Sequence, residues 1–166
     1  MDWNYKKIAK KKKPVIIATG ASNLTDVIRA VKTILKFNKK LILMQCNTNY
    51  TAEDINTNHL NLNVLNEYKK IFGNKVILGL SDHTYGNNSV LGSVALGARV
   101  VEKHFTDDNS RSGPDHLFSM NPQTWKNMVK QTRILENSLG DGKKKIEPNE
   151  QSSSIVQRRA IRLNKK

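Results

Sequence analysis

Short apolar runs alternate with longer amphipathic stretches along most of the chain, and this alternation limits the folds that the sequence can adopt. Each run is rich in leucine and β-branched residues, as the buried strands of parallel sheets are. Four such runs occur, at Val15–Ala18, Leu41–Met44, Lys75–Leu80 and Arg99–Glu102. Strands separated by helices join through right-handed crossovers into a parallel sheet. The pattern therefore predicts an α/β fold of four successive strand–helix units, which fits either a small open sheet or half of a (β/α)8 barrel.

The stretches that follow the runs carry apolar residues at the three- and four-residue spacing of amphipathic helices. Side-chain caps, a proline in the first turn and glycines at the ends mark their limits. The expected helices follow a cap at Ser22 or Asn23, cover Leu60–Phe72 and Ser89–Ala98, and run from a cap at Asn121 to Gly140. After Gly140 the chain becomes polar and rich in lysine. We therefore expect one domain over residues 1–140, a linker over Asp141–Ser154 and a short basic tail to Lys166.

The formal net charge of +14 raises the question of a nucleic-acid partner, because clustered cations release counterions from phosphates. The lysines gather at the apparent ends of helices and strands, where solvated lysine is common, so we expect no nucleic acid. No apolar run is long enough to span a membrane, and no apolar segment of a secretory signal follows the basic N-terminus. The single cysteine, Cys46, excludes an intrachain disulfide and suits a reducing cytoplasm.

Two histidines, His83 and His104, come directly after predicted strands that are neighbours in chain order. Neighbouring strands lie ~4.8 Å apart, so imidazoles at matching ends can reach one cation. Imidazole nitrogens are common ligands of divalent metals. Two protein ligands leave positions open for water and substrate, as Lewis-acid chemistry requires. The pattern predicts a divalent metal site; two separately hydrogen-bonded structural histidines are the alternative.

Ser22 and Ser81 are small hydroxyl donors at strand ends. A phosphate or carboxylate could be held there by hydroxyl and backbone N–H groups, although helix capping explains Ser22 almost as well. The run Asn47–Asn49 and the adjacent Tyr50 offer polar contacts at the end of the second strand. These strand ends meet at one rim of a parallel sheet, which is where α/β folds bind ligands.

Gly113 and Pro114 punctuate a loop that follows the His104 strand. This loop could fold over the rim and bring Asp115 and His116 into the site. An ordinary surface turn is the alternative.

At these residues the chain resembles the N-acylneuraminate synthase family, which includes bacterial sialic, legionaminic and pseudaminic acid synthases. The resemblance rests on an ordered set of motifs. They are ATGAS at 18–22, QCNTNY at 45–50, GLSDHT at 79–84, ALGA at 95–98, EKHFT at 102–106 and GPDH at 113–116.

The resemblance implies a manganese-dependent condensation of phosphoenolpyruvate with an N-acyl hexosamine such as N-acetylmannosamine, with release of phosphate, in surface-carbohydrate biosynthesis. It implies that His83 and His104 bind the metal. It also implies substrate contacts from five residues: Ser22 and Ser81 to phosphoenolpyruvate, Asn49 and Tyr50 at the second strand end, and Asp115 to the sugar or a metal-bound water.

By comparison with that family, we expect the chain to be a partial (β/α)8 barrel. It would correspond to the C-terminal half of the barrel domain, which contains the last four strand–helix units. The family's phosphoenolpyruvate-binding lysine and catalytic glutamate are then expected in the other half, so that no catalytic residue is assigned here. Residues 141–166 resemble the linker into an antifreeze-like domain that is otherwise absent. We expect a fragment with little activity alone, acting as a homo-oligomer or with a missing-half partner. The alternative is a non-catalytic subunit that binds metal or sugar beside a separately encoded partner.

Overall fold

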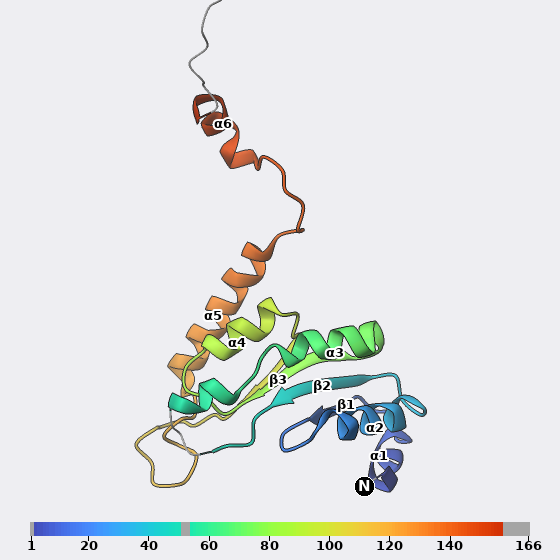
Figure 1. Cartoon of the computed structure of the whole chain (residues 1–166). Helices are drawn as coiled ribbons and strands as arrows, with labels where there is room; N and C mark the ends of the chain where they lie inside the picture. The colour runs from blue at the N-terminus through green and yellow to red at the C-terminus, as the bar shows by residue number, and fades with distance from the viewer. Residues whose placement is uncertain (1, 51–53, 158–166) are drawn as a thin grey trace, which may run out of the picture.

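A computed structural model describes residues 2–50 and 54–157, and its centre is a four-stranded parallel sheet (Figure 1). The strands pair in chain order, and all three pairings are parallel. They are β1 Val15–Ala18, β2 Leu41–Cys46, β3 Ile77–Asp82 and β4 Val100–Lys103. The predicted α/β fold of strand–helix units is confirmed, and the sheet forms half of a barrel.

Helices connect and follow the strands, as the amphipathic pattern predicts. The longer ones are α1 Asp2–Ala9, α2 Leu24–Leu35, α3 Val64–Phe72, α4 Asn88–Ala95 and α5 Pro122–Leu139. Short 3-10 turns occupy η1 Asp54–His59, η2 Gly73–Lys75 and η3 Pro148–Glu150, and α6 covers Gln151–Gln157. The side chain of Asn23 caps α2, and Asn121 forms a capping box with Thr124 at the start of α5.

The main core lies between the sheet and the helices on one of its faces. Leu41 and Leu43 of β2 are buried there against Val31 and Ile34 of α2 and Leu65 of α3. Side chains alternate between the two faces of a strand. The residues that point away from this core include Ile16 and Ile77, which are 54% and 48% exposed. One face of the sheet is therefore covered by helices, and the other is open.

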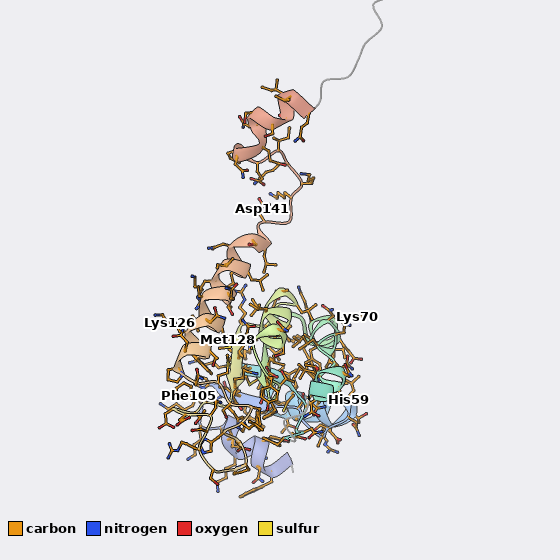
Figure 2. The ribbon with its side chains drawn as sticks, turned by 90° about the vertical axis from the view of Figure 1, so that its left-hand side faces the viewer. His59, Lys70, Phe105, Lys126, Met128 and Asp141 are labelled. Atoms are coloured by element: carbon orange, nitrogen blue, oxygen red, sulfur yellow. The ribbon has the colours of Figure 1, made fainter. Side chains whose placement is uncertain are left out.

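A second, smaller cluster joins α4 to α5. Met128 of α5 is buried with Val90 of α4 and Met120, and Trp125 packs against them. Figure 2 shows Met128 on the side of α5 that faces the sheet, whereas Lys126 points away from the body. This contact holds α5 against α4, and Val101 of β4 packs against the same cluster.

Some boundaries differ from the expected ones. β2 extends to Cys46 and β3 to Asp82, because the ladder continues through the polar pairs Gln45 with Leu80 and Cys46 with Ser81. The helix expected from Leu60 begins at Val64, after Asn61 adopts a left-handed φ of 48°. The expected linker contains η3 and part of α6, which lies beyond the far end of α5 (Figure 1).

Among the described helices, none is both long and apolar enough to cross a membrane.

Candidate metal and substrate site

The imidazoles of His83 and His104 face each other at the open rim of the sheet. Each residue comes one position after a strand, and the last residues of those strands, Asp82 and Lys103, are register partners. The ring centroids are 5.0 Å apart, with the planes inclined by 73°. The predicted arrangement of two histidines at matching ends of neighbouring strands is therefore present.

A main-chain contact fixes the orientation of His83, which is only 6% exposed. Its Nδ1 lies 2.8 Å from the carbonyl oxygen of Asn47. A carbonyl can only accept, so Nδ1 carries the proton and the Nε2 of the neutral ring keeps its lone pair. Metal-binding histidines are commonly held in this way, because the second hydrogen bond sets both tautomer and ring direction.

Two aromatic rings enclose the histidine pair. The centroid of the Tyr50 ring lies 4.3 Å from that of His83 and 5.5 Å from that of His104. The ring of Phe118 also lies near the pair, 5.2 Å from that of His104. Phe118 is buried, whereas Tyr50 is about half exposed. The site thus combines a buried apolar ring with a half-exposed tyrosine that can reach a ligand.

The loop after β4 brings Asp115 to the same place. Its Oδ2 lies 3.7 Å from Nδ1 of His104, close enough for electrostatic attraction to a protonated ring. His116 does not join the site, because its Nδ1 pairs with Oγ1 of Thr106 at 2.8 Å. Asn109 secures the loop by donating to the carbonyl oxygens of His116 and Ser119, both at 2.8 Å. Of the two loop residues singled out in the sequence, Asp115 alone approaches the histidines.

These residues fit a divalent cation with open coordination positions. His83 offers an oriented Nε2, His104 lies beside it, and the carboxylate of Asp115 is near. Within residues 2–50 and 54–157, no group of three or more histidine, cysteine or acidic side chains could by itself hold a metal ion. Two imidazole ligands leave room for water and substrate, which suits Lewis-acid chemistry better than a closed structural site.

A row of polar side chains lies one layer deeper on the same open face. Cys46, Ser81 and Glu102 are register partners on β2, β3 and β4. The Oγ of Ser81 donates to Oε1 of Glu102 at 3.2 Å, and Ser81 is buried. Burial raises the pKa of the Cys46 thiol, against the opposing effect of its hydrogen bond with Ser81. Because residues two apart on a strand share a face, Ser81 lies directly below His83.

Ser22 stands apart from the histidine pair. Ser22 follows β1, which is two strands away from β3, and its Oγ donates to the carbonyl of Gly20 at 3.2 Å. It lines a cavity of about 150 Å³ with Thr19 and Arg29. Asn49 is tied to the histidine region instead, because its main-chain N–H donates at 2.9 Å to the side chain of Asn47, whose carbonyl oxygen contacts His83. The histidine region therefore lies at the ends of β3 and β4, whereas the cavity beside Ser22 lies between β1 and the helices α1 and α2, with Tyr5 and Val27 in its lining.

Two residues at or behind the site, Glu102 and Asp82, were not singled out from the sequence as functional. Asn47 was singled out within the polar run Asn47–Asn49, but its contact with His83 is made by the main-chain carbonyl, which leaves no sequence signal. Glu102 could have been found, because it lies two residues before His104 and so shares its face. Asp82 immediately precedes His83 and lies on the other face of the sheet, and its pairing with Lys103 is not visible in the sequence.

Comparison with known proteins places these residues in a defined family. The model of the NeuB family matches residues 4–144. The N,N'-diacetyllegionaminic acid synthase of Campylobacter jejuni is 40% identical over 159 residues, which are 94% of this chain and 46% of that protein. The enzyme of the same name from Legionella pneumophila is 38% identical, over 95% of this chain and 44% of its own length.

A solved structure agrees with these matches. The N-acetylneuraminic acid (sialic acid) synthetase of Leptospira borgpetersenii, determined in complex with citrate, superposes with a TM-score of 0.81 at 27% identity. The superposition covers 93% of this chain and 53% of that one. The chain thus spans about half the length of the relatives that it matches.

Proposed function

The chain belongs to the NeuB family, and on that premise we propose that it supplies the metal-binding half of a (β/α)8 barrel that makes a nonulosonic acid. The proposed reaction condenses phosphoenolpyruvate with an N-acyl hexosamine and releases phosphate. The observation that carries the proposal is the pair His83 and His104, facing each other at 5.0 Å on neighbouring strand ends.

The histidine region would hold the reacting end of the sugar. A divalent cation, Mn²⁺ in this proposal, would supply Lewis-acid polarisation of the sugar carbonyl when bound. His83 and His104 would hold that cation through ring nitrogens, with His83 fixed by its contact with Asn47. Asp115, 3.7 Å from His104, is placed to accept a hydrogen bond from a sugar hydroxyl or a bound water.

Tyr50 and Asn49 would complete the sugar side of the site. The half-exposed ring of Tyr50 lies against both histidines, so a sugar bound there would contact its face or its hydroxyl. Sugars present apolar C–H faces that pack on aromatic rings, while their hydroxyls need polar partners. Asn49, whose main chain is held by Asn47, can offer such a partner from the same strand end.

Phosphoenolpyruvate would lie toward β1 and the layer below the histidines. Ser22 lines the cavity at the end of β1. Arg29 lines it too, but its guanidinium is paired with Asp26 at 2.9 Å, so the hydroxyl of Ser22 is the group offered to the anion here. Ser81 lies below His83 on the open face and can donate its hydroxyl to a ligand in place of Glu102. The proposal therefore places the phosphoenolpyruvate contacts at Ser22, after β1, and at Ser81, on the open face.

Within the described residues no further strand joins the sheet beside β1 or β4, and one face of the sheet is open, so we infer that the sheet has a partner. A barrel closes only when further parallel strands pair with both edges. We propose that this partner is the complementary half-barrel, on this polypeptide or another, or a second copy of the chain. It would also supply the lysine and the glutamate that the family is expected to use in catalysis.

Reconstitution tests this function. The chain is mixed with the first half of the barrel of the Campylobacter jejuni synthase, and phosphate release is measured with phosphoenolpyruvate, N-acetylmannosamine and Mn²⁺. The proposal predicts release that requires both polypeptides and is lost in a His83→Ala, His104→Ala variant. An associated mixture that binds Mn²⁺ but releases no phosphate with any N-acyl hexosamine would favour a non-catalytic subunit.

A further inference from the structure

A buried ion pair lies directly behind the two histidines, on the face of the sheet that packs against the helices. The Nζ of Lys103 is 2.6 Å from Oδ2 of Asp82, and the two side chains are only 2% and 0% exposed. Neither residue can reach a ligand at the open rim. The proposed reaction therefore gives this pair no direct role.

Each residue of the ion pair is the sequence neighbour of one of the two histidines. Asp82 immediately precedes His83, and Lys103 immediately precedes His104. Side chains alternate along a strand, so an anchored residue on the helix side fixes the direction of its neighbour on the open side. The ammonium of Lys103 also donates to the carbonyl oxygen of Thr84. One cation thus holds the residues on both sides of His83.

Further contacts tie Asp82 to helix α4. Its Oδ1 accepts from the main-chain N–H and from the hydroxyl of Thr84, at 3.0 and 2.8 Å. Its Oδ2 accepts from the hydroxyl of Ser89, in the first turn of α4. Every buried side-chain nitrogen or oxygen among the described residues has a hydrogen-bond partner. The network is complete and directional.

Stability alone does not explain such a network. Burying two charges costs desolvation free energy that their attraction scarcely recovers, and apolar replacements of buried pairs are often equally stable. What an apolar pair cannot reproduce is direction, because only the ammonium bonds to both Asp82 and the carbonyl of Thr84. The arrangement is suited to fixing positions at the strand ends.

We propose that Asp82 and Lys103 are positioning residues that set the separation and orientation of His83 and His104. The consequence for metal binding rests on the proposed function, whereas the effect on the histidine rings does not. Removing the pair should loosen residues 82–84 while leaving the sheet and helices folded.

The first test needs no metal. Nuclear Overhauser effects between the ring protons of His83 and His104 are measured in the full chain and in an Asp82→Leu, Lys103→Met variant. The control is Arg133→Met, Glu136→Leu, which removes an ion pair of the same 2.6 Å length on the exposed surface of α5. The proposal predicts a ring contact that weakens or disappears in the buried-pair variant only, at a nearly unchanged thermal midpoint.

The second test measures Mn²⁺ affinity in the same proteins. Loss of supporting contacts around metal ligands typically costs about 10–100-fold in affinity, and we expect a loss in that range for the buried-pair variant and none for the surface control. An Asp82→Asn, Lys103→Gln variant, which keeps neutral hydrogen-bonding groups, repeats both measurements if the apolar variant folds poorly.

The two proposals can fail separately. Absence of Mn²⁺ binding by the unaltered chain counts against the metal site, while the ring contact still decides the positioning role. A folded buried-pair variant whose ring contact is as strong as that of the unaltered chain would overturn the inference.

Discussion

The ring of His83 is held at Nδ1 by the main-chain carbonyl oxygen of Asn47, 2.8 Å away, and so presents Nε2 to the open rim. The side chain of Asn47 orders the same segment. Its Nδ2 donates to the carbonyl of His59 at 3.1 Å, and its Oδ1 accepts from the main-chain N–H of Asn49. One strand end thus supports a histidine that lies on another strand.

Asn47→Ala should therefore weaken metal binding without removing a ligand. Without its side chain, the segment that carries the Asn47 carbonyl and Tyr50 loses two anchors. Supporting groups of this kind are worth about 10–100-fold in affinity, and we expect a fall toward the lower limit. Calorimetric titration with Mn²⁺ measures it, with the exposed Asn74→Ala as control. Equal affinity in all three proteins would contradict the role of Asn47.

The thiol of Cys46 should react slowly at neutral pH. Cys46 is buried, and this burial raises the pKa of its thiol above the ordinary value of 9.0. The thiol therefore stays protonated at a pH where a free cysteine begins to ionise. The rate of alkylation by iodoacetamide, followed by mass spectrometry from pH 7 to 10, should rise with a midpoint above 9.0. Cys46 is the single cysteine of the chain, so a Cys46→Ser variant gives the background. A midpoint below 9.0 would show that the thiol is not buried in solution.

The core between the sheet and α3 should respond strongly to truncation. Leu65 is fully buried among the leucines of β2 and β3. Leu65→Ala should lower the free energy of unfolding by about 2–5 kcal/mol, through lost burial and the cavity left behind. Urea denaturation measures this, with Leu117→Ala as control because Leu117 is 63% exposed. Similar losses for both variants would contradict the assigned core.

Asn121 should contribute to both a helix and a loop. Its Oδ1 caps α5 by accepting from the N–H groups of Gln123 and Thr124, while its Nδ2 donates to Asn109 in the loop that carries Asp115. Asn121→Ala should cost about 1 kcal/mol of stability, the usual value of a cap. Asn121→Asp keeps the cap and removes the donor to Asn109, so it should be nearly as stable as the unaltered chain.

Hydrogen exchange separates these two effects. In Asn121→Asp, the amides of residues 107–119 should exchange faster while those of α5 remain protected. Unchanged exchange in the loop would show that the contact with Asn109 does not hold it.

The order of strands and helices could be predicted from periodicity, because buried runs and amphipathic stretches follow from one-sided burial. The ends of the strands were harder to predict. β3 extends through Ser81 to Asp82, although both are polar, because their partners on β2 and β4 continue the ladder. Tertiary pairing therefore overrides the polarity on which the expected end depended.

The candidate site likewise has a part that the sequence predicts and a part that it does not. The histidine pair was predictable because equivalent positions on neighbouring strands must lie close together. The contact of His83 with the Asn47 carbonyl was not, since every residue carries the same main-chain group. The pairing of Lys103 with Asp82 could not be predicted either. It requires both side chains to lie on the helix side of the sheet, where Ser89 of α4 also contacts Asp82.

Binding of Mn²⁺ to the purified chain, measured by calorimetry beside a His83→Ala, His104→Ala variant, tests the central claim most directly. The account predicts binding to the unaltered chain at a single site and its loss in the variant. Absent binding, or equal binding by both proteins, would contradict a metal site at the ends of β3 and β4.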